Sequence, residues 1–120
     1  MKQPLAFIIE DDEVIAGIYE AALRESQYLT EIIRDGLEAL QRLAKVEPDL
    51  VILDLHLPKV AGISVLRIIR EDTRLNRTRV IVVSADATLS EYMRQKADMV
   101  LVKPVGFNQL RELAIKYLPT

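Results

Sequence analysis

The chain has 120 residues, half of them hydrophobic, and it contains no cysteine. This length fits a single domain over residues 1–120 that buries a working core, and the missing cysteines exclude disulfides and thiolate metal sites. Acidic and basic residues are interleaved at a net charge of −2. This balance argues against direct nucleic-acid binding by the domain.

Membrane insertion and export are also not expected. Apolar runs are short and separated by charge, so none reaches the length of a membrane span. Residues 1–5 contain no apolar signal segment. We therefore expect a cytoplasmic protein without a membrane partner, and the absence of cysteine fits a reducing compartment.

The first half of the chain predicts two strands, each followed by a helix. Residues 5–9 are apolar and end at Glu10-Asp11-Asp12, which is typical of a buried strand. Val14, Ile18, Ala21 and Ala22 then recur at helical spacing and predict a helix to about residue 26. Residues 28–34 alternate loosely and predict a second strand nearer an edge.

A second helix and a third strand follow. Asp35 and Glu38 occupy the N-cap and N3 positions of a capping box, so a helix is predicted to begin there. After it, Val51-Ile52-Leu53-Asp54 is an unbroken apolar run that ends in a carboxylate, which is typical of a strand buried on both faces. Because a charge inside such a strand would be costly, Asp54 is expected at its C-terminal end.

The remaining elements continue the same alternation. They are a helix at about 63–72, a strand at 80–83, a short helix at 88–95, a strand at 99–102 and a helix at 107–117. Five strand–helix units in succession predict an α/β fold, a doubly wound five-stranded parallel sheet with helices on both faces.

The polar residues at the strand ends predict one site. The C-terminal ends of parallel strands share an edge, and ligands bind at that edge in open α/β sheets. We therefore expect Asp11, Asp12, Asp54, Ser84 and Lys103 to meet there.

The residue types at this edge suit phosphoryl transfer. Three carboxylates repel one another unless a cation is bound, and ligands that are all oxygen favour Mg²⁺. Lys103 and the Ser84 hydroxyl would face the oxygens of a phosphoryl group while a carboxylate attacks it. The predicted product is an aspartyl phosphate.

The chain resembles the receiver domain of two-component response regulators from about residue 5 to residue 118. The matching residues are Asp11-Asp12, Asp54, Pro58, Gly62, Ser84-Ala85 and Lys103-Pro104. This resemblance implies a flavodoxin-like fold with strand order 2-1-3-4-5.

The resemblance also implies the chemistry and the partners. Asp54 would accept a phosphoryl group from a sensor histidine kinase or a histidine phosphotransfer protein, with Ser84 and Lys103 on the phosphate. Asp11, Asp12, Asp54 and the backbone carbonyl of His56 would hold Mg²⁺. The domain would act as a signalling switch for an effector domain or a downstream protein, not as an enzyme beyond transfer to and hydrolysis from Asp54.

Two features depart from the family pattern. Val100 stands where receivers commonly carry Tyr or Phe, and the segment between Ser84 and Lys103 is shorter than usual by about one helical turn. A short or displaced fourth helix is therefore expected, and the usual relay between the hydroxyl residue and an aromatic ring cannot operate in its common form.

Three alternatives stay open at this stage. Asp11 and Asp12 could simply cap the first helix. The domain could be a pseudo-receiver, a phosphorylation-independent module for protein interaction or homodimer formation. A phosphatase of the haloacid-dehalogenase type is disfavoured because its second aspartate is replaced by His56.

A basic run falls around the end of the third predicted helix. It consists of Arg67, Arg70, Arg74, Arg77 and Arg79. Such a run is usually a solvated surface, and contact with a partner is the second interpretation.

Overall fold

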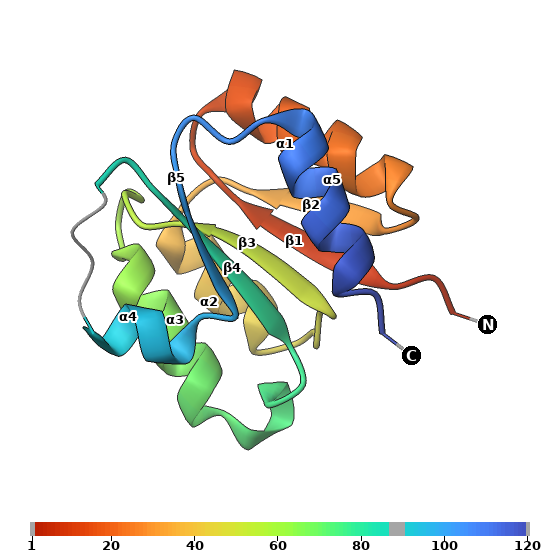
Figure 1. The fold of residues 1–120 in the computed structure, drawn as a ribbon. Coiled ribbons are helices and arrows are strands. Elements are labelled where there is room, and N and C mark those ends of the chain that lie inside the picture. The colour runs from red at the N-terminus through yellow and green to blue at the C-terminus, as the bar shows by residue number, and fades with distance from the viewer. Residues whose placement is uncertain (1, 87–90, 120) are drawn as a thin grey trace.

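The computed structural model describes residues 2–86 and 91–119. Its parallel strands form one five-stranded sheet in the order β2-β1-β3-β4-β5 (Figure 1). The strands are β1 (Leu5–Ile9), β2 (Leu29–Ile33), β3 (Leu50–Asp54), β4 (Arg79–Ser84) and β5 (Met99–Val102). The α/β class and the strand order are therefore confirmed.

Helices connect the strands. They are α1 (Glu13–Glu25), α2 (Gly36–Leu43), α3 (Gly62–Glu71), α4 (Glu91–Lys96) and α5 (Phe107–Lys116), with a 3₁₀ turn η1 (Thr73–Leu75) after α3. The predicted start of the fourth helix, at Thr88, lies outside the described residues. Among the helices that are described, none is both long and apolar enough to cross a membrane.

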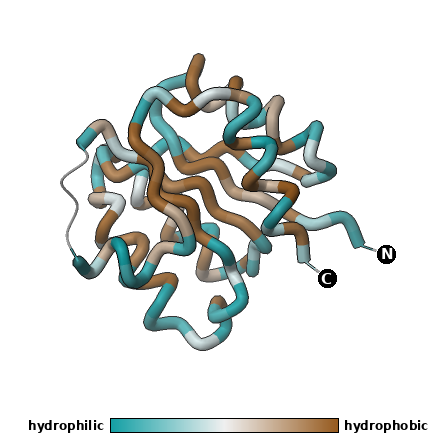
Figure 2. The backbone as a smooth tube through the Cα atoms, viewed as in Figure 1, coloured by the Kyte–Doolittle hydropathy of each residue, from teal (hydrophilic) through white to brown (hydrophobic). Residues whose placement is uncertain are grey.

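The helices cover both faces of the sheet and create two cores. Successive strand residues point to opposite faces, so Ile8 packs in the core under α1 and α5 while Phe7 packs in the core under α2, α3 and α4. Figure 1 shows α1 and α5 together on one side, and Figure 2 shows hydrophobic strands enclosed by helices with hydrophilic outer sides. All four apolar residues of β3 are buried, as expected for a central strand.

The N-cap of α2 is as predicted. The Asp35 carboxylate accepts a hydrogen bond from the Glu38 N–H at 2.8 Å. The Glu38 carboxylate reaches back to the N–H of Arg34 at 3.4 Å, one residue before the N-cap. The helix therefore begins at Gly36, where the free N–H of Glu38 finds a carboxylate partner in the N-cap Asp35.

The predicted core face of α1 is wrong in part. Val14 and Ile18 are 73% and 44% exposed. The side chains that face the core are Ala16, Tyr19, Ala22 and Leu23. α1 packs against α5 as well as against the sheet, so the buried face is set by two neighbours and includes small alanines that permit close approach.

Candidate functional site

Polar residues at the C-terminal ends of four adjacent strands lie at one edge of the sheet. Glu10 directly follows β1 and Lys103 directly follows β5, while Asp54 and Ser84 are the last residues of β3 and β4. The register pairs Asp54 with Val83, the residue before Ser84. Sequence-distant groups therefore converge at the edge that the strand pattern predicted.

The Lys103 ammonium joins two buried carboxylates. Its Nζ lies 3.2 Å from Asp54 Oδ2 and 3.2 Å from Glu10 Oε1. The Glu10 and Asp54 side chains are only 2% and 3% exposed, and that of Lys103 is 23% exposed. The two acids are thus held out of water beside a single cation that reaches solvent.

Crowding at this edge shifts proton affinities. Burial and the hydrogen bond with Asp54 raise the pKa of Glu10 to about 7. Burial of the Lys103 ammonium opposes its charge, but the charge of Asp54 and the hydrogen bond to Glu10 outweigh burial and raise the Lys103 pKa. Without a further cation, one acid at this edge therefore holds its proton close to neutral pH.

The acidic cluster differs by one residue from the predicted set. Carboxylate oxygens of Glu10, Asp11 and Asp54 lie within 4.8 Å of one another. The Asp12 carboxylate is used elsewhere, because it accepts the N–H of Ile15 at 3.0 Å and caps α1. The structure therefore places Glu10, and not Asp12, in the acidic cluster, and Asp12 caps α1 as the capping alternative expected.

A signal in the sequence could have identified Glu10. Glu10 is the first residue after the apolar run of β1, the same position that Lys103 occupies after β5. The side chain at that position is still flanked by neighbouring strands, and Glu10 donates its backbone N–H to Ile33 O at 2.9 Å. Asp12, two residues further on, has already entered the first turn of the helix.

The loop after Asp54 is held tightly. The backbone N–H of His56 donates to Asp54 Oδ1 at 3.0 Å, and the Gly62 N–H donates to Leu55 O at 3.1 Å. A Cβ on Gly62 would lie 2.4 Å from Asp54 O, so only glycine fits there. The His56 side chain is exposed, and its backbone carbonyl remains the predicted fourth metal ligand.

Ser84 is buried at the end of β4, where its Oγ accepts the N–H of Asp86 at 3.1 Å. The backbone N–H of Lys103 donates to Ser84 O at 2.8 Å. Ser84 and Lys103 are thus fixed relative to each other through the β4–β5 pairing. The hydroxyl lies at the predicted edge, and its role toward a phosphate stays a prediction.

β5 and α4 hold the two features that depart from the family pattern, Val100 and the fourth helix. α4 has six residues in the described structure, and half-buried Val100 packs against the core formed with α2 and α3. A valine in that packing cannot perform the rotation that an aromatic ring performs in the common relay.

The donor set suits a small, hard divalent cation. Three carboxylates with no histidine or cysteine ligand among them favour Mg²⁺ over softer metals. The raised pKa of Glu10 is a further sign, since burial, the hydrogen bond with Asp54 and the charge of Asp54 all disfavour a second ionised acid unless a cation is bound. The residues present therefore fit Mg²⁺, with Glu10 in place of Asp12.

Comparisons with known proteins agree with this geometry. The sequence profile described as "Response regulator receiver domain" matches residues 6–115. The polar-differentiation response regulator DivK of Brucella anthropi is 31% identical, over 92% of this chain and 93% of DivK. The autoinducer 2 sensor kinase/phosphatase LuxQ of Vibrio vulnificus is 34% identical over 88% of this chain, which spans only 12% of LuxQ.

A solved structure shows the same fold. The receiver domain of the sensor histidine kinase PA1611 from Pseudomonas aeruginosa, crystallised with a magnesium ion in its active site cleft, has a TM-score of 0.82. It is 24% identical, and the match covers 97% of this chain and 98% of that domain. With its profile match, strand order and converging acids, the chain belongs to the response regulator receiver domain family.

Proposed function

We propose that this domain accepts a phosphoryl group on Asp54 from a phosphohistidine of a sensor histidine kinase or a phosphotransfer protein. The observation that carries the proposal is the Lys103 ammonium, 3.2 Å from Asp54 and 3.2 Å from Glu10 at the ligand-binding edge of the sheet. A cation beside a buried carboxylate stabilises both the nucleophile and the oxygens of an incoming phosphate.

The reaction follows from these positions. A carboxylate oxygen of Asp54 attacks phosphorus, a P–O bond forms as the P–N bond to the donor histidine breaks, and the departing imidazole takes up a proton. Lys103 and the Ser84 hydroxyl donate hydrogen bonds to the phosphoryl oxygens. The His56 N–H keeps the carboxylate oriented through Asp54 Oδ1.

The acidic cluster would hold the metal. Carboxylates of Glu10, Asp11 and Asp54, with the His56 backbone carbonyl, would bind Mg²⁺. When bound, the ion would neutralise both the crowded acids and the phosphoryl oxygens.

An exposed apolar patch lies next to the acidic cluster. Val14 and Ile18, four residues apart on α1, are exposed, and α1 begins two residues after Asp11. Exposed apolar side chains beside a reactive site are suited to contact with a partner protein. This patch is the surface we assign to the phosphohistidine donor.

A single labelling experiment tests the proposal. The protein is incubated with radiolabelled acetyl phosphate, with and without Mg²⁺, and covalent label is counted after denaturation. We expect Mg²⁺-dependent label that is lost in Asp54→Asn. Asp72→Asn is the matched control, because it makes the same change at the N-cap of η1, where asparagine also caps well.

Val100 favours a second candidate function, the pseudo-receiver. Its packing in the core removes the usual switching element. Absence of label in the wild type, with equal partner affinity for the wild type and Asp54→Asn, would support this candidate. Label that persists in Asp54→Asn would overturn Asp54 as the acceptor.

A further inference from the structure

A cleft of about 840 Å³ lies at the end of the sheet away from Asp54. It is formed where β4 begins, where the chain enters β5, and where α4 and α5 end. Its volume is within the range of roughly 300–1,000 Å³ usual for small-molecule sites. Nothing in the proposed phosphoacceptor chemistry uses it.

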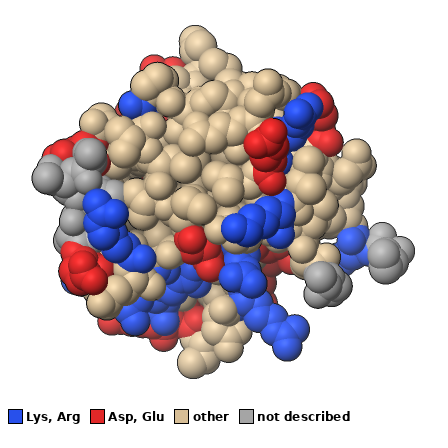
Figure 3. Space-filling model, viewed as in Figure 1, with Lys and Arg blue, Asp and Glu red and all other residues tan. Residues whose placement is uncertain are grey.

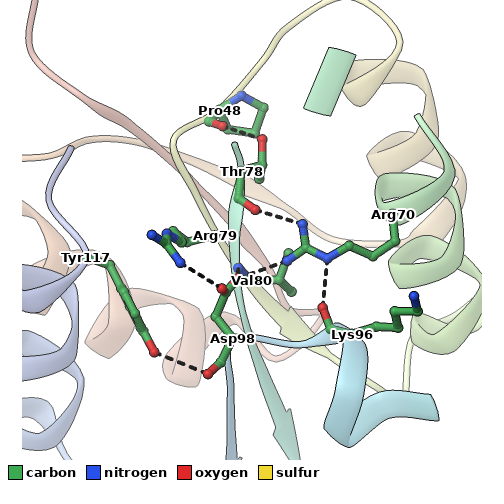
Figure 4. Close-up of polar contacts among 8 residues, drawn as sticks. All are labelled: Pro48, Arg70, Thr78, Arg79, Val80, Lys96, Asp98 and Tyr117. Carbon is green, nitrogen blue, oxygen red and sulfur yellow. Dashed lines mark hydrogen bonds and ion pairs between the residues drawn. The ribbon is translucent and has the colours of Figure 1, made fainter. Parts of the chain in front are cut away.

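The floor of the cleft is fixed by Asp98. Its carboxylate accepts the backbone N–H of Val80 at 2.7 Å and is paired with Arg70 at 2.9 Å and Arg79 at 3.1 Å (Figure 4). Tyr117 adds a hydrogen bond to the Asp98 carbonyl at 3.2 Å. The residues at the base of the cleft are therefore held in place by hydrogen bonds and ion pairs.

Arg70 fixes the surrounding elements. Its guanidinium also donates to Lys96 O at 2.7 Å and to Thr78 O at 2.9 Å (Figure 4). The ends of α3 and α4 and the start of β4 are thereby connected, and side chains on the rim are presented from rigid positions.

The rim carries positive charge without a matching carboxylate. Arg77, Lys96 and Lys116 are exposed, and within residues 2–86 and 91–119 none of them has a carboxylate partner within ion-pair distance. Within the described part of the chain, five basic residues and two acidic ones, Asp49 and Asp98, line the cleft, an excess of three positive charges. The whole chain has a net charge of −2, so the excess is local.

The arginines of the basic run fall into two groups, according to whether they contact an aromatic ring or a carboxylate. Arg67, Arg70, Arg74 and Arg79 contact an aromatic ring or a carboxylate, whereas Arg77 contacts neither among the described residues. Figure 3 shows basic side chains gathered near the start of β5, between α4 and α5. A solvated face is the ordinary explanation of scattered cations, but Arg77, Lys96 and Lys116 come from three separate segments of the chain and line one cleft.

We propose that this cleft binds a small anion carrying a diphosphate group, such as a nucleoside diphosphate. The three unmatched charges offset the roughly threefold negative charge of such a group, and the fork of Arg77 suits phosphate oxygens. The amides of Asn76 and Gln95, which also line the cleft, supply further donors.

Recognition in this cleft is directed to the phosphates and not to a base. The ring of Tyr117 already lies 5.8 Å from the Arg79 guanidinium and 5.8 Å from the Lys116 ammonium, so it is engaged by two cations. Pyrophosphate and different nucleoside diphosphates should therefore bind with similar affinity, and a nucleoside should not bind.

Calorimetric titration tests the proposal. Pyrophosphate, ADP and adenosine are titrated separately into the protein in EDTA, at moderate salt. We expect saturable binding of pyrophosphate and ADP, no binding of adenosine, and a loss of roughly 10–100-fold in affinity in the double variant Arg77→Gln/Lys96→Gln. Asp54→Asn should bind as the wild type does, because Asp54 lies at the other end of the sheet.

The matched control is Lys45→Gln/Arg67→Gln, which changes the net charge equally at exposed residues outside the cleft lining. Equal weakening in this control would overturn the proposal, since binding would then reflect overall charge. Absence of saturable binding at millimolar pyrophosphate would also overturn it. A short single-stranded oligonucleotide could also bind more tightly than pyrophosphate and lose affinity in Arg77→Gln/Lys96→Gln. That result would overturn the diphosphate proposal and identify nucleic acid as the ligand of the cleft.

Discussion

Glu10 and Asp12 are two residues apart and have different surroundings. Glu10 is buried against Lys103 and Asp54, while Asp12 is exposed and caps α1. A carboxylate in the cluster contributes charge to the site, whereas a capping carboxylate contributes to helix stability. The two acids should therefore respond differently to the same chemical change.

We expect Glu10→Gln to weaken Mg²⁺-dependent labelling of Asp54 roughly tenfold or more, because a ligand charge is removed. Asp12→Asn should label within about twofold of the wild type, since asparagine is an equally good N-cap. Initial rates of labelling against Mg²⁺ concentration measure both effects. A larger loss of Mg²⁺-dependent labelling in Asp12→Asn than in Glu10→Gln would indicate that Asp12, and not Glu10, is the metal ligand.

The raised pKa of Glu10 predicts a pH dependence of stability. Its pKa is about 7 in the folded, metal-free protein, against an ordinary value of 4.5. Between these values the folded state holds a proton that the unfolded state has lost, so the free energy of unfolding falls as pH rises through this window. The stabilisation is complete below pH 4.5 and lost above pH 7.

Glu10→Gln removes this titration. In EDTA we expect the stability of Glu10→Gln relative to the wild type to increase by roughly 1–3 kcal/mol between pH 5 and pH 8, at about 1.4 kcal/mol per pKa unit. Denaturant unfolding of both proteins at the two pH values measures the change. A constant difference would show that Glu10 titrates like an exposed carboxyl.

The loop between β3 and α3 depends on its contact with the start of α2. Gly36 donates its N–H to Pro58 O at 3.1 Å, and Lys59 lies 3.6 Å from Asp35. A Cβ on Gly36 would lie 2.0 Å from Val60 O. The loop that carries His56 is therefore braced by backbone that tolerates no side chain.

We expect Gly36→Ala to destabilise the protein by roughly 1–3 kcal/mol, the usual cost of overpacking, and to weaken Mg²⁺ binding by displacing the loop. Gly17→Ala is the control, since a Cβ there meets no atom within 4 Å. Being inside α1, it should stabilise by about 0.5–1 kcal/mol. Unfolding curves separate the two, and a stable Gly36→Ala with normal labelling would contradict the bracing role.

The whole molecule has two polar ends joined by an apolar sheet. Acids crowd the C-terminal edge, and basic residues surround the opposite cleft. The acids of this edge come from the ends of β1 and β3 and meet only in the folded state, so a cation bound there should stabilise the entire domain.

Millimolar Mg²⁺ should raise the melting temperature of the wild type, with a gain of about 2.7 kcal/mol at a concentration one hundred times the dissociation constant. Thermal unfolding with Mg²⁺ or EDTA measures the shift. Asp54→Asn should show a smaller shift, and Asp12→Asn the full one. An equal shift in Asp54→Asn would place the ion elsewhere.

Local sequence patterns were sufficient to predict the strands and the edge of the sheet at which Asp54 and Lys103 meet. The run Val51–Leu53 before Asp54 is unambiguous because a central parallel strand is apolar on both faces. The order of units along the chain then places the strand ends together. These features depend on sequence neighbours and on the general geometry of parallel sheets.

Only the three-dimensional packing decided which side chains of α1 are buried and which acid joins the cluster. Val14 and Ile18 are more hydrophobic than Ala16 and Ala22, yet α5 and the sheet select the alanine face of α1. Glu10 rather than Asp12 joins the cluster because the chain turns into the helix cap between them. Arg77, which has no carboxylate partner among the described residues, was indistinguishable in the run from Arg70 and Arg79, since their partner Asp98 comes from another part of the chain and only folding brings these charges into contact.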